Sequence, residues 1–222
     1  MTGRWEPVRK QSMRKRVYDR VHTPGLLRSL FEHVRGREQM LVRGFGHWPL
    51  LLVSFPPGGR EAADELRESW LHTLPSLQTP EAEPYHRILS RLPVIVVVLL
   101  RSRNVCTCLG HHHPMGTESR LARRLAVDAG CEVGEIDLAW ESIRDWQPQP
   151  LASLASGVTP NSFARLHFRA ALLTVLLLHE LEHLAFPDRE ESSVRNASDE
   201  FYTYLLGDLL RQEGAPGFGM LR

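Results

Sequence analysis

The feature that most constrains this chain is a long helical segment near its end, expected from about residue 163 to residue 185. It carries the apolar run Ala170–Leu178, continues into a polar stretch, and is stopped by Pro187. The polar stretch includes two histidines. A helix with these side chains in an apolar core would bury polar ring nitrogens, which need partners there.

The polar stretch contains the pattern His-Glu-x-x-His, with histidines at 179 and 183. Residues four apart on a helix lie one above the other on the same face, so His179 and His183 can present nitrogens to one divalent ion. Glu180 is rotated by about 100° from His179, because a helix has 3.6 residues per turn. It can therefore reach a water on that ion and is placed to act as a general base.

This motif and the apolar run before it resemble the zincin metallopeptidases, most closely the small intracellular members whose third ligand is a glutamate. The resemblance covers about one tenth of the chain. It implies an active-site helix beside a mixed sheet, with zinc bound by two histidines and water activated by the glutamate. Carried over by position, His179 and His183 would be metal ligands and Glu180 the base.

The motif does not identify the third metal ligand. No histidine follows His183, so a downstream carboxylate is expected. The segment Ser198–Leu206 looks like the second helix of the small intracellular zincins, but their ligand glutamate would fall on Arg195, which cannot bind a metal.

Helical-wheel arithmetic places Asp199 at the border of the buried stripe of this second helix, whereas the usual chemistry of the class favours Glu200. We therefore rank Glu200 and Asp199 about equal as third ligand. Glu191 ranks behind them, because it requires a helix that begins near Ser192 and a tight return of the chain.

The rest of the chain predicts an α+β protein. The continuous β-branched run 94–100 is typical of a strand buried on both faces. Further patterns predict a hairpin from 40–43 and 50–55, a strand at 133–140, and helices at 25–34, 60–74 and 116–130. We expect a small mixed sheet packed against the His-Glu-x-x-His helix and a C-terminal helix, in one zincin-like domain (21–222) after a poorly ordered basic tail (1–20).

A second group of metal-binding residue types follows the expected central strand. It comprises Cys106, Cys108, His111, His112 and His113. Thiolates with imidazoles suit zinc, but the Cys-x-Cys spacing is tight and no second pair exists. A second metal site, a substrate-contacting loop and an ordinary polar turn all remain open.

Composition limits the partners. The net charge of the 222 residues is +1, so no overall field attracts nucleic acid or an anionic membrane. Three cysteines are a low, odd number, which favours a reducing compartment. No secretory signal is visible, and no apolar run reaches the roughly 20 residues of a spanning helix. We expect a cytoplasmic protein without a membrane or nucleic-acid partner; oligomeric state cannot be inferred.

These patterns favour a zinc-dependent hydrolase, foremost a metallopeptidase acting on a peptide or protein. Two alternatives remain. Two histidines and one carboxylate also hold Fe²⁺ in non-haem oxygenases and hydroxylases, which act on peptides or small molecules. Arg195, at the family's ligand position, would also fit a non-catalytic zincin-like regulatory module.

Overall fold

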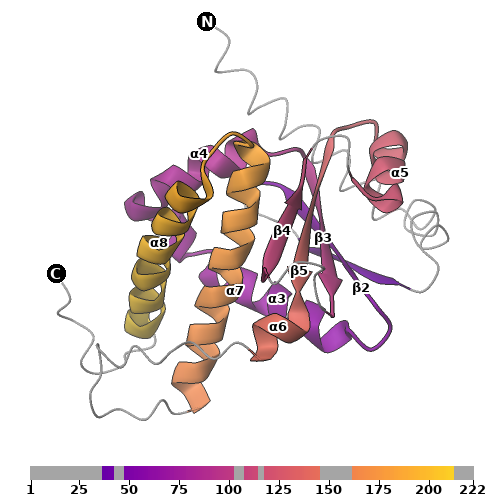
Figure 1. Ribbon diagram of the computed structural model, residues 1–222. Helices are drawn as coiled ribbons and strands as arrows, with labels where there is room; N and C mark the ends of the chain where they lie inside the picture. Colours follow the sequence, from indigo (N-terminus) through magenta and orange to yellow (C-terminus); the bar gives the residue numbers. More distant parts are fainter. Residues whose placement is uncertain (1–36, 43–47, 103–107, 115–117, 146–161, 213–222) are drawn as a thin grey trace, which may run out of the picture.

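A five-stranded mixed sheet forms the centre of the molecule (Figure 1). The computed structural model describes residues 37–42, 48–102, 108–114, 118–145 and 162–212. The strand order is β1-β2-β3-β5-β4, in which β2, β3 and β5 are parallel and the edge strands β1 and β4 are antiparallel to their neighbours. The strands are β1 (Glu38–Val42), β2 (Leu50–Phe55), β3 (Ile95–Arg101), β4 (Gly110–His113) and β5 (Val133–Ala139).

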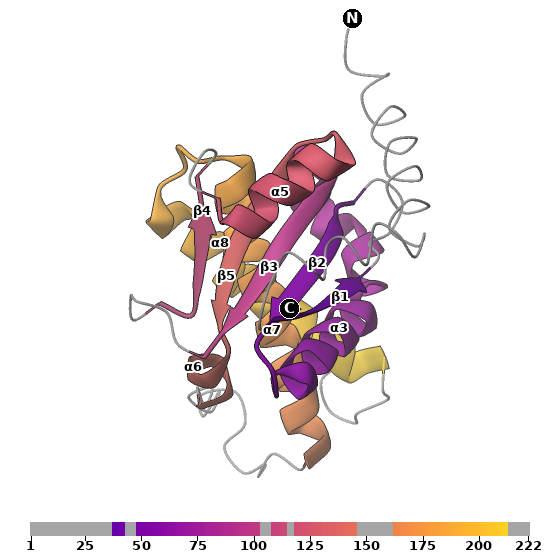
Figure 2. The same cartoon turned by 90° about the vertical axis from the view of Figure 1, so that its right-hand side faces the viewer.

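Helices cover both faces of the sheet. One face packs against α3 (Arg60–Thr73), α4 (Glu83–Arg91) and α7 (Ser162–Ala185), and α8 (Glu191–Gln212) lies along the outer side of α7 (Figure 1). The other face is covered by α5 (Arg120–Ala129) (Figure 2). The remaining elements are α6 (Trp140–Asp145) and the 3-10 turns η1 (Ser76–Gln78) and η2 (Pro80–Ala82). None of the described helices is both long enough and apolar enough to cross a bilayer.

The central strand β3 shows why the sheet needs cover on both sides. Side chains alternate between the two faces of a strand. Val96, Val98 and Leu100 therefore join the core under α7, while the residues between them join the core under α5. The prediction of a strand buried on both faces is confirmed.

The α+β class is confirmed, together with the hairpin, the strand at 133–140 and the helices at 60–74, 116–130 and 163–185. Gly130 ends α5 with a φ of +62°, a left-handed conformation that glycine adopts without strain. The predicted helix 25–34 and the basic tail 1–20 lie outside the described residues.

Two elements differ from the prediction. The stretch 78–84 has a Pro- and Glu-rich composition typical of a loop, yet it runs through η2 into α4, where Pro84 occupies the first turn and so costs no helical hydrogen bond. The stretch Gly110–His113, expected as a turn or loop, is strand β4. This stretch lies at an edge of the sheet and lacks the apolar pattern of a buried strand. Its pairing partner β5 is distant in sequence, so no local pattern indicates the pairing.

We expect Leu205→Ala to lower the free energy of unfolding by about 2–5 kcal/mol, because Leu205 is fully buried in the core that α8 shares with α7 and its truncation leaves a cavity. Leu71→Ala is the matched control: Leu71 is 42% exposed, so its loss should cost about 0.5 kcal/mol or less. Urea denaturation of both variants measures the difference. Equal effects would contradict this account of how α8 docks.

Candidate metal centre

The C-terminal end of α7 brings two imidazoles together. The ring centroids of His179 and His183 are 4.9 Å apart, and both Nε2 atoms face the carboxylate of Glu191. His183 Nε2 lies 2.9 Å from Oε2 of Glu191, and His179 Nε2 lies 3.6 Å from Oε1. Two ligands on a tetrahedral zinc at 2.0–2.1 Å are about 3.3 Å apart. These separations therefore suit a shared divalent ion.

The structure places Glu191, the lower-ranked candidate, beside the two histidines, so Glu191 becomes the candidate third ligand. Glu191 joins the two histidines in a group whose potential ligand atoms all lie within 4.8 Å of one another. Glu200 and Asp199 are exposed and do not belong to this group. Glu191 opens α8, whereas residue 199 lies about 12 Å further along the helix axis at 1.5 Å per residue.

The tight turn between α7 and α8 explains this position. The backbone N–H of Phe186 donates to the carbonyl of Glu182, and that of Arg189 donates to the carbonyl of Phe186. The Arg189 guanidinium also pairs with the buried Glu182 carboxylate and lies 4.7 Å from the centre of the Phe186 ring. These contacts return the chain within five residues, so Glu191 begins α8 beside the histidines.

Two further residues of α8 contact the candidate ligands. Ser198 Oγ lies 3.1 Å from Nδ1 of His179. If Nε2 of His179 binds the metal, Nδ1 is protonated. Its N–H then donates a hydrogen bond to Ser198 Oγ, and this bond sets the orientation of the ring. Arg195, one turn after Glu191, donates to its Oε1 at 3.1 Å. The arginine at the expected ligand position thus holds the carboxylate that occupies the site.

The charges around the centre favour metal-binding forms. Burial lowers the pKa of His179 and outweighs the opposing effect of Glu191, and His183 and Arg195 lower it further, which favours the neutral imidazole that binds metals. Burial acts to raise the pKa of Glu191, but His179, His183 and Arg195 outweigh it and hold that pKa below its usual value. Glu191 therefore remains an anion.

Glu180 is the most strongly perturbed acid of the site. Its side chain is buried against β4, so closely that a Cβ at Gly110 would lie 2.4 Å from Oε1 of Glu180. Only a glycine allows this approach of the strand to the carboxylate. Burial raises the pKa of Glu180 to about 8, with smaller contributions from the negative charges of Glu191 and Asp137.

Sequence reasoning did not single out His112 for this site. Its ring stacks on His183, with centroids 5.0 Å apart and planes 14° from parallel, and its Nδ1 lies 3.9 Å from Oε2 of Glu180. Burial and the neighbouring histidines lower its pKa to about 4, so it is neutral at pH 7. Its position follows from the alternation of β4, which becomes evident only once this stretch is known to be a strand.

The other described members of the Cys and His group do not form a metal-binding group with one another. His113 lies in a separate group with Glu135 and Asp137. Cys108 is disulfide-bonded and offers no thiolate, and Cys106 lies outside the described residues. Of this group, His112 contacts a histidine of α7, and it does so from a strand rather than a loop.

Comparison with known proteins found no matching family model, no matching curated protein and no matching solved structure.

We expect Glu191→Ala to lose the metal that wild type binds at this centre, because the two imidazoles keep no anionic partner. Glu200→Ala and Asp199→Ala are matched controls on the same helix and should keep it. Elemental analysis after dialysis against a weak chelator measures the metal-to-protein ratio. Loss of metal in either control, with retention in Glu191→Ala, would restore the original ranking.

We expect Ser198→Ala to weaken metal binding by about 10- to 100-fold, because His179 loses the partner of its Nδ1. Ser192→Ala, at an exposed position of the same helix, should leave affinity unchanged. Competition against a fluorescent zinc chelator gives both affinities. Equal affinities in the two variants would show that Ser198 does not orient the ring.

Proposed function

We propose that this protein is a zinc-dependent hydrolase, and specifically a metallopeptidase with a zincin-like arrangement. The observation that carries the proposal is the buried carboxylate of Glu180 beside a donor set of two imidazoles and one carboxylate.

The donor set suits a catalytic zinc ion. His179, His183 and Glu191 would hold it, and three protein ligands leave a fourth coordination position open. When bound there, zinc polarises a carbonyl group and lowers the pKa of a water molecule to about 7.

Glu180 then acts as the proton carrier. Its carboxylate takes a proton from the attacking water, and the same oxygen returns that proton to the leaving amine as the C–N bond breaks. Burial raises the pKa of Glu180, which makes its ionised form a stronger base toward water, and a cation bound beside it would favour that ionised form. Because Gly110 has no side chain, the carboxylate can lie directly against β4.

The position of β4 supports a peptide substrate. It is one of the two edge strands of the described sheet, antiparallel to β5, and it passes directly beside Glu180. An extended peptide can pair with such an edge and bring its backbone carbonyls to the end of α7. The zincin-like arrangement is therefore proposed from α7, the mixed sheet and this edge strand together.

The same donor set would also hold Fe²⁺ in an oxygenase or hydroxylase. The buried Glu180 favours hydrolysis, because water attack needs a base at this position. A non-catalytic module was suggested by Arg195 alone, and Arg195 here pairs with the ligand candidate Glu191.

We expect Glu180→Gln to keep its bound metal and to lose peptide hydrolysis by about 10²- to 10⁴-fold, since the amide cannot accept the proton. Glu190→Gln, an exposed acid in the turn before α8, is the control and should retain activity. The assay is cleavage of a mixed fluorogenic peptide library by the zinc-loaded protein. Full turnover by Glu180→Gln would overturn the mechanism, and O₂-dependent product from iron-loaded wild type would favour the oxygenase.

A further inference from the structure

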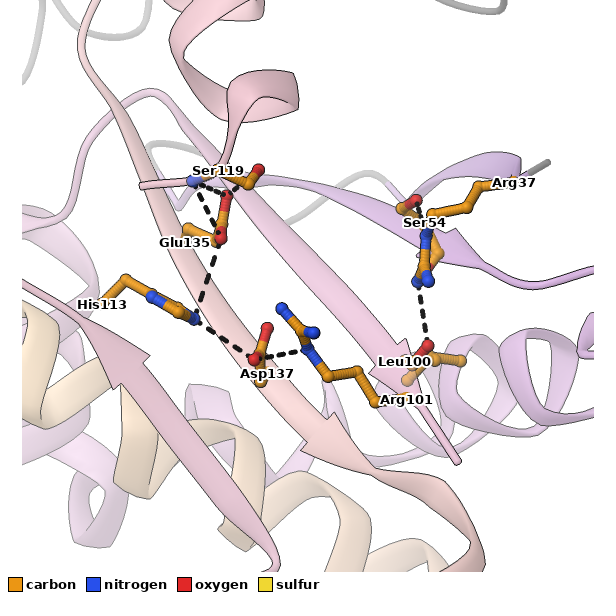
Figure 3. A network of polar contacts seen from close by, with 8 residues as sticks. All are labelled: Arg37, Ser54, Leu100, Arg101, His113, Ser119, Glu135 and Asp137. Carbon is orange, nitrogen blue, oxygen red and sulfur yellow. Dashed lines mark hydrogen bonds and ion pairs between the residues drawn. The ribbon is translucent and has the colours of Figure 1, made fainter. Parts of the chain in front are cut away.

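A second cluster of metal-binding side chains lies on the opposite face of the same two strands. Gly110 and His112 of β4 face α7, so His113 points to the other face. In the register of the sheet, His113 pairs with Glu135 of β5, and Asp137 follows two residues later on the same face. Figure 3 shows the three side chains turned toward one another between the strands and the start of α5.

The two carboxylates of this cluster are buried. Glu135 is 0% exposed and Asp137 is 6% exposed. One guanidinium, from Arg101, pairs with Asp137 Oδ2 at 2.6 Å. Carboxylates removed from water are costly unless cations or hydrogen-bond donors compensate them. A second guanidinium, from Arg37, is close enough for the charges of both carboxylates to act on it, but its hydrogen bonds go to Ser54 and to the backbone carbonyl of Leu100.

The ligand atoms converge without bonding to one another. Nε2 of His113 lies 3.2 Å from Asp137 Oδ2 and 3.7 Å from Glu135 Oε1, close to the roughly 3.3 Å expected between two ligands of one metal. Yet this buried Nε2 has no hydrogen-bond partner, and neither does the buried Oδ1 of Asp137. The three side chains thus offer ligand atoms within 4.8 Å of one another, and two of their polar atoms lack a hydrogen-bond partner.

Further contacts hold the two carboxylates in place. The backbone N–H of Ser119 donates to both oxygens of Glu135 at 3.0 and 3.1 Å, and its hydroxyl donates to Oε2. The Arg101 guanidinium holds Asp137 in the same way. Carboxylates that bind metals are commonly hydrogen-bonded by a second layer of donors.

We propose that His113, Glu135 and Asp137 form a second site for a divalent transition-metal ion, separate from the centre at the end of α7. One imidazole and two carboxylates suit Zn²⁺ or Mn²⁺. The ion would tie β4 to β5 and so hold the edge strand, with Gly110 and His112, against α7. This site does not depend on the proposed hydrolase activity.

The test is a metal count on the full chain. Chelator-treated protein is dialysed against Zn²⁺, and in a parallel series against Mn²⁺, and the bound metal is measured by mass spectrometry. With the favoured ion, wild type should hold two ions per chain, His113→Ala one, Glu191→Ala one and the double variant none. His111→Ala is the matched control: it removes an exposed imidazole from the same strand and should leave two ions.

A second readout separates binding from misfolding. In Glu191→Ala, where only the second site remains, the favoured ion should raise the melting temperature, and Asp137→Asn added to that variant should abolish the rise while keeping the side chain's shape. An unchanged metal count in both His113→Ala and Asp137→Asn would overturn the proposal. The cluster of His113, Glu135 and Asp137 would then be an ion-pair network without a metal. If wild type binds two ions but does not hydrolyse peptides, the result counts against the proposed function and leaves the second metal site supported.

Discussion

The burial of α7 is the constraint on which the rest of the structure depends. Its middle turns are apolar on several sides and pack between the sheet and α8. The last two turns nevertheless carry four ionisable side chains into the same surroundings, where each needs a partner. Helix α8 supplies partners for the two histidines and the turn supplies Arg189 for Glu182, whereas Glu180 lies against β4, with His112 Nδ1 3.9 Å from its Oε2. The candidate centre therefore arises where the polar side chains at the end of one buried helix meet groups from α8, the turn and β4.

Strand β4 connects the two groups of metal-binding residues. Consecutive side chains of a strand point to opposite faces. His112 therefore stacks on His183 at the first centre, while His113 meets Glu135 and Asp137 on the other face. Arg101 and Ser119 keep the second group in place from β3 and from the start of α5 (Figure 3).

Local patterns predicted those parts of the molecule that depend on neighbours in sequence. The periodicity of α7 places His179 and His183 on one face, and this follows from 3.6 residues per turn without any tertiary contact. The β-branched run of β3 likewise predicted a strand with both faces buried. By contrast, β4 has no apolar pattern, because it is a short edge strand whose residues are mostly histidines. Its strand character comes from pairing with β5, more than twenty residues away.

The sequence by itself determined the α+β class, the helix with two aligned imidazoles, and the acid beside them, because each follows from a repeat over a few residues. Only the tertiary structure decided that Glu191, rather than Glu200 or Asp199, faces the imidazoles. That outcome depends on how sharply the chain turns after α7, which the ion pair of Glu182 with Arg189 stabilises. Only the tertiary structure also brought Glu135 and Asp137 to His113, because strand register is set by the packing of whole faces and not by any short motif.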